Sequence, residues 1–322
     1  MKKWRPVAGV VAVEPQVGVA ARHPLAGLRH LVDDVIGQRR TESLPVAAVG
    51  AVPVAVDELG GVGHGTTPNH SPLTVLVPTV DHMYWENIVF DALDPRALGR
   101  FWEEALGTEQ LTDEPGIYET RLHHDGGPDL DLCFQQVPEP PSEPLRLHLD
   151  LRGGAEQQST VDRLLGLGAS HLDIGQKDVP WVVLGDPEGN PFCVMEERAV
   201  YSDTGPLAAL PLDSGDPDRD VGLWAWLTGW VPAPGVAPHS LRHASHRGPL
   251  LELCPEPGPK GEGKNRVHLD VRLEAGDDAD EVARGVADRG GRELHHPEWG
   301  DLPWRFFADG SGNDFCVLPA RD

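Results

Sequence analysis

Apolar and polar positions alternate in a regular order from residue 83 onward, and this order predicts short strands and amphipathic helices. The first unit reads as a strand, a helix and two further strands, at 85–92, 93–107, 116–124 and 130–137. We expect its helix to begin after Asp94, which suits an N-cap and is followed by Pro95, and to end at Gly107. We interpret the unit as a β-α-β-β-β module, of which the pattern marks these four elements.

A second unit repeats this order. It reads as a strand, a helix and two strands, at 146–152, 155–168, 180–186 and 190–197. The turn DPEGN joins the last two strands, since Asp and Asn side chains cap turns and Gly adopts a left-handed backbone. Alternation after the turn should send Phe192 and Val194 to one face of the sheet and Cys193 to the other.

The chain then repeats itself after about 120 residues. Four blocks recur in the same order: LDPRALGRFWEEALG (93–107) with GDPDRDVGLWAWLTG (215–229), VPEP (137–140) with CPEP (254–257), RLHLDL (146–151) with RVHLDV (266–271), and VPWVVLGDPEGNPFCV (179–194) with LPWRFFADGSGNDFCV (302–317). Matched order indicates a duplication, so we predict two domains, at 83–200 and 204–319, with two modules in each.

Residues 1–82 differ from the rest. They contain a single aromatic residue, Trp4, and are rich in Val, Ala, Gly and Pro, so little there can anchor a packed core. Two interpretations stay open: a disordered extension, or an artefact of start-codon choice with Met83 as the true start.

The net charge of −24 lies entirely in residues 83–322, because residues 1–82 hold seven basic and seven acidic side chains. Such acidity argues against nucleic acid or anionic lipid as partners and favours cations, although it also serves solubility. No apolar run is long enough to span a membrane, and the four cysteines show no C-x-x-C spacing. We therefore expect a cytoplasmic protein with reduced thiols.

Tandem β-α-β-β-β modules, the DPRALGRFWEEALG helix, the HLD strand and the DPEGNPF hairpin together resemble the vicinal oxygen chelate superfamily. The resemblance is nearest to glyoxalase-like domains of actinobacterial type and covers roughly 83–200 and 204–319. It implies an α+β fold of tandem glyoxalase/bleomycin-resistance-like domains, in which two modules form a curved mixed sheet around a cup. It also implies a small molecule bound in that cup, often over a divalent metal.

The resemblance places four cup positions in each repeat, and metal-dependent members carry His or Glu there. These positions are Asn87, Gln135, His148 and Cys193 in the first repeat, and Ala209, Glu252, His268 and Cys316 in the second. Few of these residues are of the family's ligand type, and a hard-ion site needs several oxygen or imidazole ligands. We therefore expect no standard metal site and no confident cofactor; if a divalent metal binds, His148 and Cys193 would hold it, since both suit zinc.

Each candidate residue also has a structural interpretation. His148 suits a general base or cup ligand, but a histidine within a sheet can simply be hydrogen-bonded. Cys193 and Cys316 are more typical of small buried hydrophobes than of nucleophiles. Trp181 is expected in the core or the cup wall, where it could stack on a planar or cationic ligand.

These observations favour a glyoxalase-like protein that binds a small molecule, cationic or aromatic, in a cup of the first repeat lined by Asn87, Gln135, His148, Trp181 and Cys193. The second repeat, with Glu252, His268 and Cys316, would be a degenerate partner. The first alternative is a metal-dependent lyase, isomerase or dioxygenase, in which groups from both repeats could complete a site. The second is a structural or interaction module whose cups are filled. Whether the protein is an enzyme, and its oligomeric state, stay open.

Overall fold

The computed structural model describes residues 83–139, 144–296 and 302–321. Residues 1–82, on which both interpretations given above depend, lie outside this part of the chain. The first module contains β1 (Met83–Ala92), α2 (Pro95–Leu106), β2 (Glu109–Glu114), β3 (Ile117–Leu122) and β4 (Leu130–Gln136). The second contains β5 (Asp150–Gly154), α3 (Gln157–Leu167), β6 (Ser170–His171), β7 (Val182–Gly185) and β8 (Pro191–Glu196).

The second repeat follows after η1 (Ala199–Tyr201), a short 3₁₀ helix. The third module contains β9 (Leu207–Ser214), α4 (Pro217–Thr228), β10 (Val231–Pro232), β11 (His239–Arg242) and β12 (Leu250–Pro255). The fourth contains β13 (Val267–Leu273), α5 (Ala279–Asp288), β14 (Arg292–Leu294), β15 (Arg305–Ala308) and β16 (Asp314–Leu318). The predicted β-α-β-β-β order therefore holds in all four modules.

The predicted helix signals act as expected. The Asp94 side chain accepts a hydrogen bond from the Ala97 N–H at 3.0 Å, and Gly107 ends α2 with a φ of 70°. Asp216 and Gly229 do the same for α4, where Asp216 accepts from the Arg219 N–H. These local signals explain why helices of equal length begin and end at corresponding places in the two repeats.

The modules pair across the repeats rather than within them. Sheet A has the strand order β14-β15-β16-β13-β1-β4-β3-β2 and so joins the first module to the fourth. Sheet B has the order β10-β11-β12-β9-β5-β8-β7-β6 and joins the second to the third. In sheet A, β1 runs antiparallel to β13, with Asn87 opposite Asp270 and Val89 opposite His268. The sequence repeats are thus not the units that build the two sheets.

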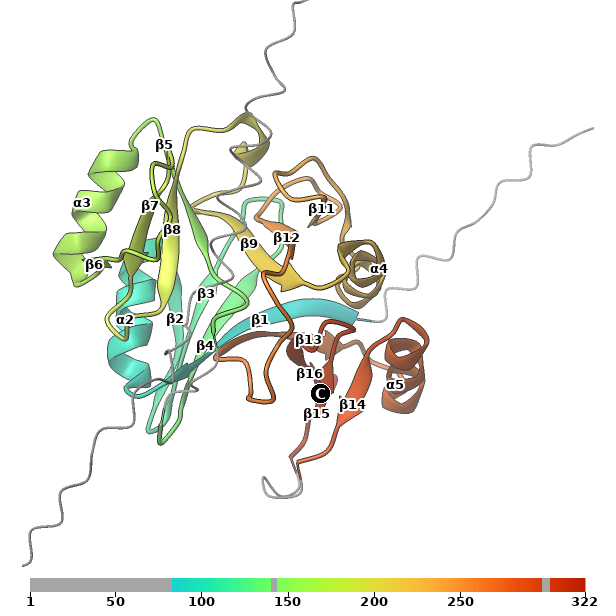
Figure 1. Cartoon of the computed structure of the whole chain (residues 1–322). Coiled ribbons are helices and arrows are strands. Elements are labelled where there is room, and N and C mark those ends of the chain that lie inside the picture. The colour runs from blue at the N-terminus through green and yellow to red at the C-terminus, as the bar shows by residue number, and fades with distance from the viewer. Residues whose placement is uncertain (1–82, 140–143, 297–301, 322) are drawn as a thin grey trace, which may run out of the picture.

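One face of each sheet packs against helices (Figure 1), and the side chains there form one continuous apolar core. Alternation places Phe90 and Phe134 of sheet A in this core, and Phe192 and Val194 of sheet B. Cys193 points to the opposite face and joins a separate apolar cluster, as predicted. The faces turned away from the helices are the two candidate cups.

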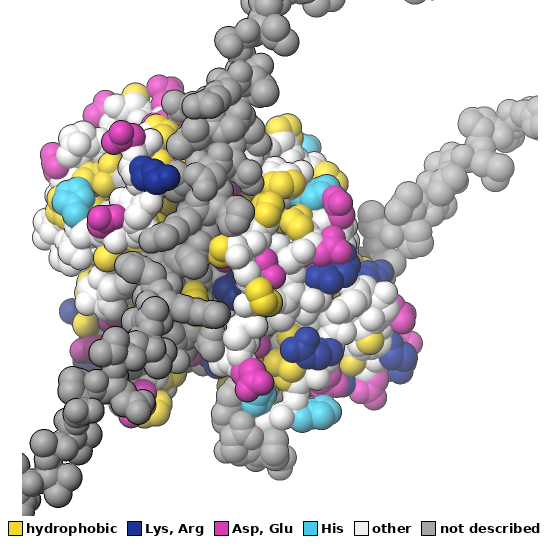
Figure 2. All heavy atoms as spheres, in the orientation of Figure 1, with side chains coloured by type: hydrophobic (Ala, Val, Ile, Leu, Met, Phe, Trp, Pro, Cys, Tyr) yellow, Lys and Arg dark blue, Asp and Glu magenta, His cyan; other side chains and the backbone are white. Residues whose placement is uncertain are grey.

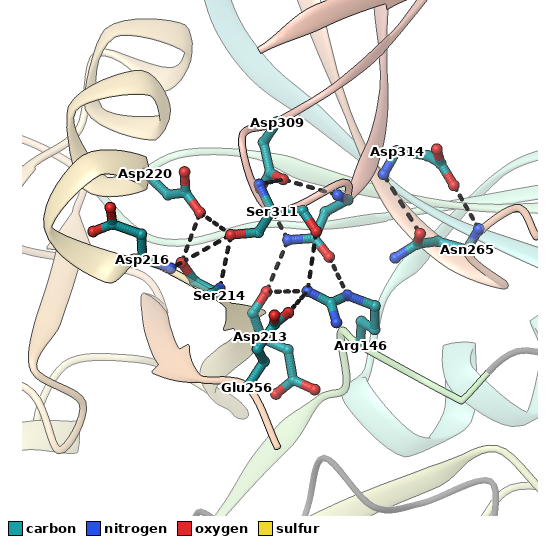
Figure 3. A network of polar contacts seen from close by, with 12 residues as sticks. Arg146, Asp213, Ser214, Asp216, Asp220, Glu256, Asn265, Asp309, Ser311 and Asp314 are labelled. Atoms are coloured by element: carbon teal, nitrogen blue, oxygen red, sulfur yellow. Dashed lines mark hydrogen bonds and ion pairs between the residues drawn. The ribbon is translucent and has the colours of Figure 1, made fainter. Parts of the chain in front are cut away.

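The duplicated hairpin turns connect the repeats. Arg146, just before β5, donates to the Asn313 Oδ1 at 2.6 Å and to the Asp213 carbonyl oxygen at 3.1 Å, and forms an ion pair with Glu256. Figure 3 shows this network around Arg146, Asp213 and Glu256. Ser311 of the same turn also accepts from the Gly215 N–H at 2.7 Å. The DGSGN turn therefore docks on the end of β9 and on the start of α4.

The first-repeat turn makes a matching contact. Arg266, before β13, donates to the Asn190 Oδ1 at 2.9 Å. Each turn also receives an indole N–H from its own repeat, since Trp102 donates to Asp186 and Trp224 to Asp309. Each turn thus holds the two repeats together. The turn of the second repeat binds Arg146 of the first, and the turn of the first repeat binds Arg266 of the second.

Candidate functional site

Cup A, the face of sheet A that carries Asn87, Gln135 and His268, contains a cavity of about 550 Å³. Its polar floor comes from β1, β4, β13 and β16. Its apolar wall includes Trp304, just before β15, and Phe306 within β15. A smaller hollow of about 390 Å³ adjoins it and shares His268 and Phe306 with it. Both volumes lie in the range of small-molecule pockets.

The floor of cup A brings together an imidazole, a carboxyl group and a thiol. His268 and Asp270 are two residues apart on β13 and so share a face, and Cys316 of β16 lies beside Asp270 in register. The His268 Nε2 is 3.5 Å from the Asp270 Oδ1 and 3.7 Å from the Cys316 Sγ. The ligand atoms of the three residues lie within 4.8 Å of one another, close enough for one metal ion to contact all of them.

Burial disfavours the charged forms of these three groups. It raises the pKa of Asp270 to about 6, against hydrogen bonds from Cys316 and Asn87 that lower it. Burial also raises the pKa of the Cys316 thiol, helped by the Asp270 charge, and lowers the pKa of His268. A thiol with a raised pKa is a poor nucleophile, so the floor does not form a Cys–His nucleophilic pair. The Asp270 Oδ1 and the His268 Nδ1 are buried without a hydrogen-bond partner among the described residues.

The charged groups of the cup A wall nearly balance. Lys264 forms an ion pair with Asp91 at 2.6 Å, and Arg272 forms one with Glu86. Glu119 accepts a hydrogen bond from Thr112 rather than from a cation. In the face seen in Figure 2, acidic side chains are spread over several elements and form no single patch. The net charge of −24 is therefore a property of the whole surface and is not concentrated in this cavity.

Cup B, the corresponding face of sheet B, has the same three groups on its floor. Cys193 of β8 lies beside Asp150 of β5 in register, and the His148 Nε2 is 3.3 Å from the Asp150 Oδ1. The ligand atoms of His148, Asp150 and Cys193 also lie within 4.8 Å of one another. Glu252 of β12 adds a fourth ionisable group; it is completely buried, and burial raises its pKa to about 7.

Side chains fill cup B. Trp181, Tyr201 and Ile174 pack with Cys193 in one buried cluster that also contains Ala209. The Arg198 guanidinium lies 5.6 Å from the centre of the Trp181 ring and 5.8 Å from that of Tyr201. Cup B is therefore closed by the chain itself, whereas cup A is open.

The predicted site residues are divided between the two cups. Asn87 and Gln135 lie in cup A, together with His268 and Cys316 of the second repeat. The others, His148, Trp181, Cys193, Ala209 and Glu252, belong to sheet B. The prediction that one cup of the first repeat holds Asn87, Gln135, His148, Trp181 and Cys193 is wrong, because the modules pair across repeats. His148 also precedes β5 instead of lying mid-strand, although its N–H donates to the Pro211 carbonyl.

Asp150, Asp270 and Tyr201 were missed by the sequence analysis. The repeated HLD motif contained the signal for the two aspartates, because residues two apart on a strand face the same side. Tyr201 carries no such signal. It lies in the connection between the repeats, and only the tertiary structure brings it over sheet B.

Comparison with known proteins agrees with this architecture. The family model of the glyoxalase-like domain matches residues 87–195 and again 209–318. The chain belongs to the glyoxalase-like domain family. No curated protein sequence matches it.

Solved structures share the fold of this glyoxalase-like chain. Glyoxalase I from Zea mays matches with a TM-score of 0.52 and 17% identity, over 74% of this chain and 92% of that one. A point mutant of the same enzyme matches with a TM-score of 0.51 over the same shares. A putative dioxygenase from Bacillus subtilis subsp. subtilis str. 168 matches with a TM-score of 0.46 and 17% identity, over 75% and 86%. At such identities the likeness concerns the fold alone. Together with the family match, it confirms the predicted α+β fold of tandem glyoxalase-like domains.

In the described part of the chain, no helix combines the length and the apolar character that a membrane span requires. The actinobacterial type and the cytoplasmic location stay predictions.

Proposed function

We propose that this glyoxalase-like protein binds a small organic molecule in the cavity of cup A. One observation carries the proposal: an open cavity of about 550 Å³ is lined both by polar side chains, among them Asn87, Gln135 and His268, and by apolar and aromatic ones. Ligand pockets combine an apolar lining with a few polar groups of this kind, which fix the orientation of the ligand. A ligand with a hydrogen-bonding group would pair with them.

The cavity lining supports an aromatic ligand that is neutral or weakly cationic. Trp304 and Phe306 supply a flat apolar wall, and their rings contact each other edge to face. Asn87 and Gln135 supply amide groups that both donate and accept hydrogen bonds. The alternative of a module with both cups filled does not suit cup A, although it describes cup B.

The test is a fragment screen by ligand-observed NMR on the full chain, with two variants matched by the duplication. His268→Ala alters the floor of cup A, and His148→Ala makes the same change in cup B. We expect fragments that bind the wild type to lose affinity about tenfold or more in His268→Ala and to keep it in His148→Ala. Binding that depends on His148 instead, or no binding by any fragment class, would refute the proposal.

A metal-dependent lyase, isomerase or dioxygenase is the second candidate, favoured by the clustered ligand atoms of His268, Asp270 and Cys316. Imidazole, carboxylate and thiolate are all zinc ligands, and three protein ligands are typical of a catalytic zinc. The residues therefore fit a zinc ion. When bound, it would polarise a substrate carbonyl group or lower the pKa of a bound water molecule.

In that candidate the chain's own groups would have defined tasks. Cys316 would release its proton on binding the metal, because burial raises the pKa of its thiol, and Asp270 would bind as a carboxylate. Asn87 donates to Asp270 and so would orient its carboxylate. Trp304 and Phe306 would exclude water from one side of the substrate.

Metal analysis separates the two candidates. The full chain is dialysed against Zn²⁺, Mn²⁺, Fe²⁺ or Ni²⁺, freed of unbound ion and analysed. About one retained ion per chain, lost in His268→Ala and kept in His148→Ala, would favour the metal-dependent candidate. No retained ion, together with fragment binding in cup A, would leave the binding protein as the function.

A further inference from the structure

The charged side chains of the cup A cavity divide into ion pairs and a remainder. The lining contains the acidic and basic residues Asp91, Glu119, Lys264, Asp270 and Arg272. Lys264 forms an ion pair with Asp91 at 2.6 Å, and Arg272 forms one with Glu86. Both cations of the lining are thus already bound to carboxylates of β1. Glu119 and Asp270 remain without a lysine or arginine partner among the described residues.

Asp270 is the less accessible of these two acids. It is 3% exposed, and its pKa is raised by burial to about 6, against hydrogen bonds from Cys316 and Asn87 that lower it. The His268 Nε2 is a further neighbour, 3.5 Å from the Asp270 Oδ1. Asp270 is therefore surrounded by groups of the floor itself, and Glu119 is the acid that a ligand can reach.

Glu119 is half-buried on β3, and its hydrogen-bond donors are neutral. The Thr112 hydroxyl donates to its Oε2 at 2.7 Å. The Cys133 thiol lies opposite on β4 and also bonds to it; burial raises the pKa of this thiol, and the Glu119 charge raises it further. Arg121, two residues along β3, is engaged with Asp131 through two hydrogen bonds of 2.7 Å. No lysine or arginine of the described chain therefore balances the Glu119 carboxylate.

Cup B places its acid differently. Glu119 and Cys133 are paired across β3 and β4, and Ser240 and Glu252 are paired at the corresponding place across β11 and β12. Glu252 is completely buried and accepts from the Val236 N–H at 2.9 Å, and burial raises its pKa to about 7. Burial thus favours the protonated form of the cup B acid. Glu119 instead lines an open cavity, where a cation from outside can reach it.

The aromatic wall of cup A lies on the other arm of the sheet. Trp304 precedes β15, and Phe306 belongs to it. In sheet A, β15 and β3 are each the second strand from an edge, with four strands between them. Side chains of both arms nevertheless line one cavity, so the curved sheet turns its arms toward each other. A molecule that contacts both arms needs a ring at one end and a positive charge at the other.

We propose that cup A binds aromatic amines, with the ammonium group on the Glu119 carboxylate and the ring against Trp304 and Phe306. The inference rests on the proposed function, whose ligand class it names. A carboxylate has about four acceptor positions, so an ammonium group can donate to Glu119 while Thr112 keeps its own hydrogen bond. Hydrogen bonds between charged groups are stronger than neutral ones. The amine is carried on a linker and not on the ring, because the two contacts lie on opposite arms.

Calorimetric titration of the full chain with three molecules of similar size tests the proposal. 4-Phenylbutylamine, 4-phenylbutan-1-ol and 4-phenylbutyrate share a ring and a linker and end in a cation, a neutral hydroxyl and an anion. We expect the amine to bind about tenfold or more tightly than the alcohol, and the carboxylate to bind most weakly. The advantage of the amine should shrink as the ionic strength rises. Equal affinities of the amine and the alcohol would overturn the inference.

Matched variants assign the preference to one residue. Glu119→Gln keeps the size of the side chain and an acceptor for Thr112 but removes the charge, and Glu252→Gln makes the same change in cup B. We expect the preference for the amine over the alcohol to fall to about twofold or less in Glu119→Gln and to persist in Glu252→Gln. A preference that survives in Glu119→Gln, whether or not Asp270→Asn abolishes it, would overturn the inference. If Glu119→Gln does not fold, the wild-type titrations at two ionic strengths still decide the ligand class.

The outcomes also separate the inference from the proposed function. Fragments that bind in a His268-dependent way, without preference for amines, would overturn only the ligand class. Absence of binding by every fragment, 4-phenylbutylamine included, would overturn both.

Discussion

Cups A and B have the same His–Asp–Cys floor, but cup A is open and cup B is filled by side chains. In cup A the floor opens into a cavity, and in cup B it lies beneath Tyr201, Trp181 and Ile174. Duplication copied the floor because alternation and strand register place those residues automatically. The cover is not copied, since it comes from the connection between the repeats, which occurs once in the described chain. Access to a duplicated site is thus decided by connections and not by the sheet.

The comparison also shows how a closed cup tolerates ionisable groups. Glu252 is completely buried, and its neighbours in cup B include Asp150 and Arg198. Strand register makes Cys133 its counterpart in cup A, since Cys133 pairs with Val89 of β1 as Glu252 pairs with Pro211 of β9. A buried acid can stay in the closed cup because its raised pKa keeps it largely protonated below neutral pH.

The largest expected difference in the free energy of unfolding is between variants of the duplicated tryptophans. Trp181→Ala should lower the free energy of unfolding by about 3–5 kcal/mol, because the ring is part of the cup B packing. Trp304→Ala should cost about 1 kcal/mol, because that ring is only half-buried beside a cavity. Urea denaturation of the two variants measures both values. Equal costs would mean that cup A is as closed in solution as cup B.

Substitution of the two duplicated hairpin asparagines should show a smaller difference in the free energy of unfolding. Asn313→Ala should cost about 2–3 kcal/mol, because its side chain accepts from Arg146 and donates to the Asp213 carbonyl and to Asp309. Asn190→Ala should cost about 1–2 kcal/mol, because its side chain makes one hydrogen bond fewer. Parallel urea curves test this order, and the reverse order would contradict the assigned network.

A smaller effect should appear in the pH dependence of stability. Folded Glu252, with a pKa of about 7 against 4.5 for the ordinary group, retains a proton that the unfolded chain has released. The free energy of unfolding should therefore fall as the pH rises from about 4.5 to about 7, and this group should add no further loss above that. In Glu252→Gln the melting temperature should fall by several degrees less over this range. Identical pH profiles of the wild type and the variant would refute the raised pKa of Glu252 in the folded protein.

The smallest change is expected in thiol chemistry, where the native fold stays intact. Burial raises the pKa of Cys133, Cys193 and Cys316, so all three should react slowly with iodoacetamide at pH 8. Cys133 and Cys316 line the cavity, and they should be modified about tenfold faster than Cys193 beneath Tyr201. Peptide mass spectrometry of the native protein measures the rates. Equal modification of Cys193 would show that cup B opens readily.

The sequence by itself determined the local structure and the duplication. Caps such as Asp94, terminators such as Gly107 and the alternation around Cys193 act within a few residues, so they can be recognised without knowledge of the rest of the chain. The repeated HLD motif likewise contained the His–Asp pair of each floor, although only the histidines were recognised as candidates.

The tertiary structure alone decided which modules share a sheet, and hence which residues share a cup. All four modules have nearly the same pattern, so no local signal distinguishes pairing within a repeat from the observed pairing of β1 with β13. The choice depends on contacts between distant segments, such as Arg146 with Asn313, whose energies arise only when both repeats are folded together. The same holds for Tyr201, whose position over cup B follows from the path of a connection.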